Sequence, residues 1–151
     1  MSNEIHVDYS SGNTLYAVIR NQDGQVWHVA GETFENWGTG GHTADDYDIA
    51  LADSDGSHYI GDFDTHISGG SYSIQIFRQA GAYPANTDTL VSSRLILWTG
   101  SGELTATKIL ANRAVMNKVD GMIDYYDDDG QTVLLTLTPC DTVGFLSRLP
   151  G

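Results

Sequence analysis

The sequence predicts a mainly β protein that carries one helix near its C-terminal end. Short segments of alternating apolar and polar residues recur between residues 14 and 98, and turn residues such as Asp-Gly separate them. The 17 glycines and the many Thr, Ser and Tyr residues favour β structure with tight turns. No predicted helix alternates with these strands, which argues against a nucleotide-binding α/β fold.

The clearest strand covers residues 71–80, near the middle of the chain. Successive side chains of a strand point to opposite faces, so one face is apolar and carries Tyr72, Ile74 and Ile76. The other face is mostly polar and carries Ser71, Ser73, Gln75 and Gln79. Glycines bound the segment on both sides. We expect an interior strand of a β-sandwich, with one face buried and the other facing water.

The chain begins with a polar segment and a hairpin. Residues 1–13 are polar and predict a loop-like arm. Strand 14–20 has apolar side chains on both faces, so we expect it to be covered on both sides or to lie at a sheet–helix junction. The turn at Asp23-Gly24 then returns the chain as strand 25–29, because glycine supplies the positive φ that such a turn needs.

More strands follow a glycine-broken connection over residues 31–44. Strand 47–52 alternates cleanly and is expected to bury Tyr47, Ile49 and Leu51. An Asp-Gly turn leads to strand 57–63, and the last strand of the series covers 90–98. About six or seven short strands at this spacing predict an Ig-like antiparallel β-sandwich.

The composition changes at residue 102, where we place the boundary between a sandwich domain (1–101) and a helix-plus-hairpin segment (102–151). Residues 104–119 predict one α-helix, which Gly121 is placed to end. Its narrow apolar seam consists of residues three or four apart, Ile109, Asn112, Met116 and Val119.

A β-hairpin with a third Asp-Gly turn is predicted after the helix. Its strands cover 122–127 and 131–138, and the second strand is expected to bury Val133, Leu135 and Leu137. The tail contains Phe145 and Leu149, and apolar residues in so short a tail indicate that it is pinned to another surface.

The helical seam predicts self-association. A single amphipathic helix must bury its apolar stripe either on its own sandwich or on copies of itself. The second arrangement would place the seam at a symmetry axis, with Asn112 setting the register. We expect a homo-oligomer, with a trimer favoured, whose interface comprises Ile109, Asn112, Met116, Val119, Phe145 and Leu149.

Charge and targeting signals exclude several functions. The chain has 20 acidic and 7 basic residues, a formal net charge of −13, which repels nucleic acids and anionic membranes. The N-terminus has neither a basic nor an apolar signal region, and no run of residues is long enough to span a bilayer. We therefore expect a protein made in the cytosol, with no nucleic-acid or membrane partner.

Motifs that carry chemistry are weak in this sequence. Asp53-Ser54-Asp55-Gly56 and 127–130 resemble the start of calcium loops but lack the closing glutamate, so hairpin turns are the preferred interpretation. The lone Cys140 favours a structural or exposed thiol. No serine lies in a nucleophile elbow. No two histidines have the spacing of a zinc helix, so surface or turn roles are preferred for His6, His28, His42, His58 and His66. We predict no catalytic residues, no metal and no cofactor.

Aromatic residues offer one binding hypothesis. Trp27, Trp37 and Tyr59 come from nearby strands and a loop, and tryptophan platforms on sandwiches stack against sugar rings. They are the candidate glycan-binding residues. The competing interpretation is that the tryptophans seal the edge of the sandwich.

Three segments resemble structural proteins of tailed bacteriophages and prophages: 109–114 and 121–135, with the Tyr-Asp-Asp-Asp-Gly ending, and 70–88. The resemblance covers about half of the chain. It implies a non-enzymatic virion component at the tail, baseplate, neck or capsid surface, with other virion proteins as partners and no catalytic residues to carry over. The alternative is a carbohydrate-binding module that recognises host-surface glycans.

Overall fold

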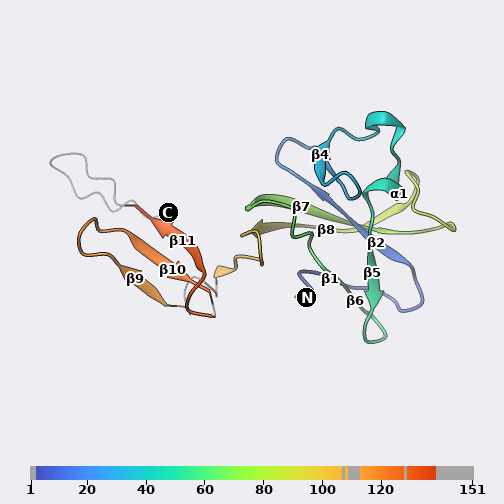
Figure 1. Ribbon diagram of the computed structural model, residues 1–151. Coiled ribbons are helices and arrows are strands. Elements are labelled where there is room, and N and C mark those ends of the chain that lie inside the picture. The colour runs from blue at the N-terminus through green and yellow to red at the C-terminus, as the bar shows by residue number, and fades with distance from the viewer. Residues whose placement is uncertain (1–2, 107, 109–112, 128, 139–151) are drawn as a thin grey trace. The chain divides into compact units, whose positions relative to one another are not determined.

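The computed structural model describes residues 3–106, 108, 113–127 and 129–138. The chain divides into two compact units, Met1–Glu103 and Leu104–Gly151 (Figure 1). Each unit is built from antiparallel strands, so the prediction of a mainly β protein is confirmed.

The first unit contains one antiparallel sheet of eight strands. Strand β2 lies at its centre, because β7 pairs with β2 along its whole length. On the other edge of β2, β5 pairs with Leu15–Ala17 and β3 pairs with Arg20. The strands are β1 (Ile5–Asp8), β2 (Leu15–Arg20), β3 (Val26–His28), β4 (Thr33–Glu35), β5 (Ile49–Asp53), β6 (His58–Gly61), β7 (Gly70–Arg78) and β8 (Thr89–Trp98).

The sheet curls into a nearly closed, barrel-like shape. Its pairing runs from β8 through β7, β2, β5 and β6 to β1, while β3 and β4 branch from β2. Arg94 of β8 donates a hydrogen bond to the backbone carbonyl of Glu4, immediately before β1, and so links the two ends. The Ig-like sandwich was expected to have two stacked sheets. The structure instead has one continuous sheet, because β5 pairs with both β2 and β6.

The interior of the curled sheet holds the main hydrophobic core. The inward face of β7 supplies Tyr72, Ile74 and Ile76, all buried as predicted. Strand β2 is also covered on both faces, as predicted: Leu15, Ala17 and Ile19 enter the main core, whereas Tyr16 and Val18 join a second cluster. That second cluster also contains Val26, Ala44 and Tyr47. The two faces therefore carry separate cores.

Two segments differ from the sequence predictions. The expected N-terminal arm contains β1, which pairs with β6, and its Ile5 is fully buried in the main core. The expected connection over 31–44 contains β4, a 3₁₀ turn (Thr39–Gly41) and the start of α1 (Ala44–Tyr47). Tyr47 is buried as expected, but it ends this short helix instead of beginning a strand.

The second unit contains a three-stranded sheet in the order β11-β10-β9. Its strands are β9 (Ala114–Met116), β10 (Ile123–Tyr126) and β11 (Val133–Leu137). The β10–β11 hairpin is confirmed, and Gly130 in its turn has a φ of 66°. Val133 and Leu137, predicted to be buried, are 47% and 45% exposed.

The helix predicted over 104–119 is wrong in its second half, because 114–116 form β9 and a turn follows. Side chains in that turn stabilise it in competition with a helix. The side-chain carbonyl of Asn117 accepts from the backbone N–H of Val119 at 2.9 Å, and Asp120 accepts from that of Met122 at 3.0 Å. The seam residues Ile109 and Asn112 lie outside the described residues.

Candidate functional site

Two histidines and a glutamate meet at the end of the β3–β4 hairpin. In this hairpin Val26 pairs with Glu35, and His28 pairs with Thr33. Side chains two residues apart on a strand share a face, so His28 and Glu35 are diagonal neighbours on one side of the hairpin. Val26, on the same face, belongs to the second hydrophobic cluster together with Tyr47 of α1.

A glycine-rich turn brings His42 to the same place. Gly38, Gly40 and Gly41 have φ values of 82°, 67° and 90°. Residues with a Cβ rarely adopt this left-handed conformation, whereas glycine adopts it at little cost. The chain therefore folds back tightly after β4, and His42 follows the turn with its ring centroid 4.1 Å from that of His28.

Glu35 is the centre of this cluster. Its Oε1 lies 2.6 Å from Nδ1 of His42 and accepts a hydrogen bond of 2.9 Å from the Tyr47 hydroxyl. Its Oε2 lies 3.9 Å from Nδ1 of His28. The backbone N–H of Gly38 donates to the Tyr47 oxygen at 3.0 Å, which holds that hydroxyl in place. The side chains of Glu35 and His28 are 14% and 15% exposed, and that of His42 is 31% exposed, so the cluster opens to solvent on the His42 side.

The hydrogen bond between Glu35 and His42 shifts both titrations. It is the main cause that lowers the pKa of Glu35 below its ordinary value, and the Tyr47 hydroxyl contributes in the same direction. The same bond to Glu35 raises the pKa of His42. Both shifts favour an ion pair between the Glu35 carboxylate and a protonated His42 ring. One ligand atom from each of His28, Glu35 and His42 lies within 4.8 Å of the other two.

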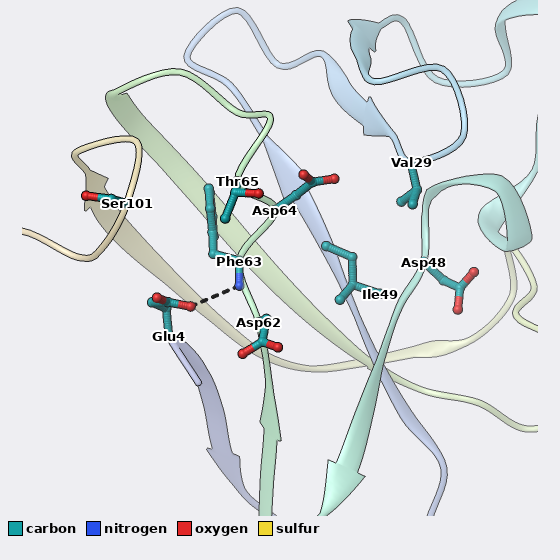
Figure 2. A pocket seen from close by; sticks show the side chains of 9 residues that line it. All are labelled: Glu4, Val29, Asp48, Ile49, Asp62, Phe63, Asp64, Thr65 and Ser101. Carbon is teal, nitrogen blue, oxygen red and sulfur yellow. Dashed lines mark hydrogen bonds between the residues drawn. The ribbon is translucent and has the colours of Figure 1, made fainter. Parts of the chain in front are cut away.

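An acidic pocket of about 560 Å³ lies elsewhere on the first unit. Figure 2 shows its lining, which comes from the segment before β1, the residue after β3, the start of β5, the β6–β7 connection and the turn after β8. Four carboxylates line the pocket, those of Glu4, Asp48, Asp62 and Asp64. Its apolar lining residues are Val29, Ile49 and Phe63.

Most of these carboxylates accept hydrogen bonds from neighbouring groups. Glu4 accepts a hydrogen bond of 3.1 Å from the Phe63 backbone N–H (Figure 2). Burial tends to raise the pKa of Asp64, but hydrogen bonds from the His66 backbone, Trp27 Nε1 and the His66 ring bring it below its ordinary value. Burial raises the pKa of Asp48, with help from the neighbouring Asp45 and Asp46. This lining disfavours anionic ligands.

The three candidate glycan-binding aromatics do not form one exposed platform. Trp27 is 3% exposed, and its Nε1 donates to Asp64 at 2.8 Å. Tyr59 is 1% exposed, and its hydroxyl donates to the backbone carbonyls of Ser10 and Asn13. Only Trp37 is exposed among them, at 36%, and its ring centroid lies 4.8 Å from that of Tyr47. Trp27 does line a smaller pocket of about 250 Å³ with Phe34 and Tyr72.

The predicted interface residues are placed only in part. Met116 on β9 is 59% exposed, and Val119 in the following turn is 94% exposed. The other four, Ile109, Asn112, Phe145 and Leu149, lie outside the described residues, as does Cys140.

No helix in the described part of the chain has the length and apolar character needed to cross a membrane.

This cluster was not predicted, because no short sequence motif links the two histidines to Glu35. His28, Glu35 and His42 are evenly separated along the chain, but no helix or turn motif imposes that spacing. Recognition of β4 was the missing step, since pairing of β3 with β4 then places His28 and Glu35 on the same face of the hairpin. In comparisons with known proteins, no family, no curated protein and no solved structure matches this chain.

Proposed function

We propose that this protein is a non-enzymatic structural component of a phage particle that assembles through its C-terminal unit. Two points support the proposal. Segments 70–88, 109–114 and 121–135 resemble phage structural proteins, and the described side chains of the second unit are exposed or half-buried. Among the described residues of 104–138, no side chain is buried. A small sheet gains stability by burying an apolar face, so this unit needs additional cover.

The exposed apolar side chains of the second unit supply the surface for such cover. Met116, Val119, Val133 and Leu137 are 45% to 94% exposed. The first unit, in contrast, fills its own interior and has fully buried side chains from β1, β2, β7 and β8. An oligomer interface of standard size removes about 1,600 Å² from water, which is the kind of burial that the second unit lacks.

The charge of the chain fits a surface role. A net charge of −13 keeps a densely packed assembly soluble and repels nucleic acid. The finer features of the proposal rest on the sequence: the resemblance supports a place at the tail, baseplate, neck or capsid surface and contacts with other virion proteins, and the apolar residues of the C-terminal segment support a homotrimer. The glycan-binding alternative keeps Trp37 as its one exposed aromatic among the three candidates.

The mass of the purified full chain tests assembly. We expect light scattering after size exclusion to give an oligomer, with three chains favoured, at micromolar concentration under reducing conditions. Val119→Asp adds a charge at a side chain that is 94% exposed, so it leaves the fold intact and weakens the oligomer. Tyr83→Asp is the matched control, because Tyr83 is 73% exposed in the first unit.

A monomeric wild-type chain at micromolar concentration would overturn the proposal. An oligomer that resists Val119→Asp but dissociates in Tyr83→Asp would place the interface on the wrong unit. The virion role is tested separately by mass spectrometry of purified particles, in which the chain must be present in stoichiometric amounts.

A further inference from the structure

We propose that His28, Glu35 and His42 form a binding site for a divalent transition-metal ion, with Zn²⁺ as the expected occupant. Two imidazoles and one carboxylate are a donor set that zinc uses in proteins, with water completing the coordination. The proposal concerns binding and assigns no reaction. It is independent of the proposed structural role, because all three residues belong to the first unit.

The distances between the donors suit a small cation. With metal–ligand bonds of about 2.0–2.2 Å, tetrahedral ligand atoms lie roughly 3.3 Å apart. Nδ1 of His28 and Oε2 of Glu35 are 3.9 Å apart, too far for a hydrogen bond and close to the separation that a shared ion needs. Nδ1 of His42 lies 2.6 Å from the other carboxylate oxygen, Oε1, and must leave that hydrogen bond to turn toward an ion on Oε2. Small side-chain rotations on the His42 side, which is open to solvent, provide that change.

The surroundings of the three donors support this assignment. The Tyr47 hydroxyl binds Oε1 of Glu35 and is itself held by the backbone of Gly38, so the carboxylate is oriented from behind. Outer contacts of this kind orient the ligands of protein metal sites. Oε2 of Glu35, however, accepts no hydrogen bond from the described residues, which leaves one carboxylate oxygen free to coordinate.

Gly31 keeps space beside the first histidine. A Cβ at residue 31 would lie 2.6 Å from Nδ1 of His28, closer than real Cβ contacts allow. A side chain at residue 31 would therefore displace the His28 ring from its position beside Glu35. Nothing in the β3–β4 turn itself explains this requirement, because the φ of Gly31 is not in the left-handed region.

The other histidine–carboxylate contacts of the described residues lack this arrangement. His58 contacts Asp8 at 2.7 Å, and its side chain is 45% exposed. His66 contacts Asp64 at 2.9 Å and Glu32 at 3.5 Å, and its side chain is 59% exposed. Neither pair has a second imidazole whose ligand atom lies within reach of the same carboxylate. His58 therefore serves as a matched control for a pair that is not a site.

Titration calorimetry with ZnCl₂ on the full-length chain tests the proposal. The titration uses a Cys140→Ser background, since a free thiol binds zinc by itself. We expect one zinc per chain. His42→Gln removes a ligand from an exposed loop position and should weaken binding at least tenfold, whereas His58→Gln should leave the affinity unchanged. Absence of binding, equal affinity in His42→Gln, or loss in His58→Gln would each overturn the proposal.

Tyr47→Phe provides a second test that keeps all three ligands. It removes the hydroxyl that orients Glu35, and loss of such a contact costs about 10- to 100-fold in metal affinity.

Co²⁺ added in place of zinc gives visible absorption bands whose intensity reports the coordination number. We expect the intense bands of a four-coordinate ion in the Cys140→Ser chain and their loss in His42→Gln. The weak bands of hydrated Co²⁺ in the Cys140→Ser chain would contradict the site, even if a variant failed to fold.

Discussion

Replacement of Ile74 by alanine tests the architecture of the first unit at β7, the strand that pairs with the central β2. Ile74 is fully buried on β7, opposite Ile19 of β2 on one side and Arg94 of β8 on the other. Its neighbour Ser73 points to the opposite face of the same strand. The two positions thus compare the interior and the exterior of the curled sheet at the same point along the chain.

The expected cost follows from burial. Ile74→Ala removes about three methylene equivalents from a buried site, at roughly 0.8 kcal/mol each, or about 2.4 kcal/mol. The cavity left in a packed core raises the loss in the free energy of unfolding to about 3–4 kcal/mol. Ser73→Ala deletes one hydroxyl at a half-buried position and should change the free energy of unfolding by less than about 0.5 kcal/mol.

Urea unfolding followed by tryptophan fluorescence measures the difference. Trp27, Trp37 and Trp98 all belong to the first unit, so the signal reports this unit without a contribution from the second. With a slope of about 2 kcal/mol per molar urea, the midpoint of Ile74→Ala should fall by about 1.5–2 M. A midpoint shift below about 0.5 M, or an equal shift in Ser73→Ala, would show that β7 does not present Ile74 to the interior.

Two further predictions concern the same unit. The pKa of Asp64 is lowered in the folded protein, so its ionised form stabilises the fold above about pH 4 and that contribution is lost as the pH falls through the folded pKa. Urea midpoints of Asp64→Asn should therefore lie below those of the wild type at pH 7 and approach them at pH 3; a constant gap would argue against this role. Gly24 has a φ of 79° in the β2–β3 turn, so Gly24→Ala should cost about 1–2 kcal/mol in the free energy of unfolding. Gly81 has no positive φ and no non-adjacent atom closer than 3.9 Å to an added Cβ, so Gly81→Ala should be neutral in the same measurement, and equal costs would refute the argument.

Strands were predictable from the sequence where alternation continues over several residues. Strand β7 is the clearest case, since Tyr72, Ile74 and Ile76 are separated by polar residues and all three are buried. Strand β1 was missed because it is short and only Ile5 of its four residues is fully buried. Its place in the sheet depends on pairing with β6, a long-range contact that a local pattern does not encode.

The curled sheet and strand β9 were not predictable for related reasons. A two-layer sandwich and a curled sheet use the same strand pattern, and pairing of β5 with both β2 and β6 decides between them. Between 113 and 119, helical spacing of apolar residues was present, but β10 pairs with Ala114–Met116 and the Asn117 and Asp120 side chains stabilise a turn. Tertiary pairing and local capping outweighed the helical pattern.

The candidate metal site shows why chemistry is harder to predict than strands. Alternation along β3 and β4 places His28 and Glu35 on one face, which a sequence could reveal once both strands are known. His42 arrives through a turn with three glycines at positive φ, whose direction no hydrophobic pattern records. The third ligand is thus positioned by backbone conformations that glycine permits. A glycine-rich segment between a strand and a histidine therefore indicates where a chain can fold back on itself. Which side chains such a turn brings together follows only from its conformation.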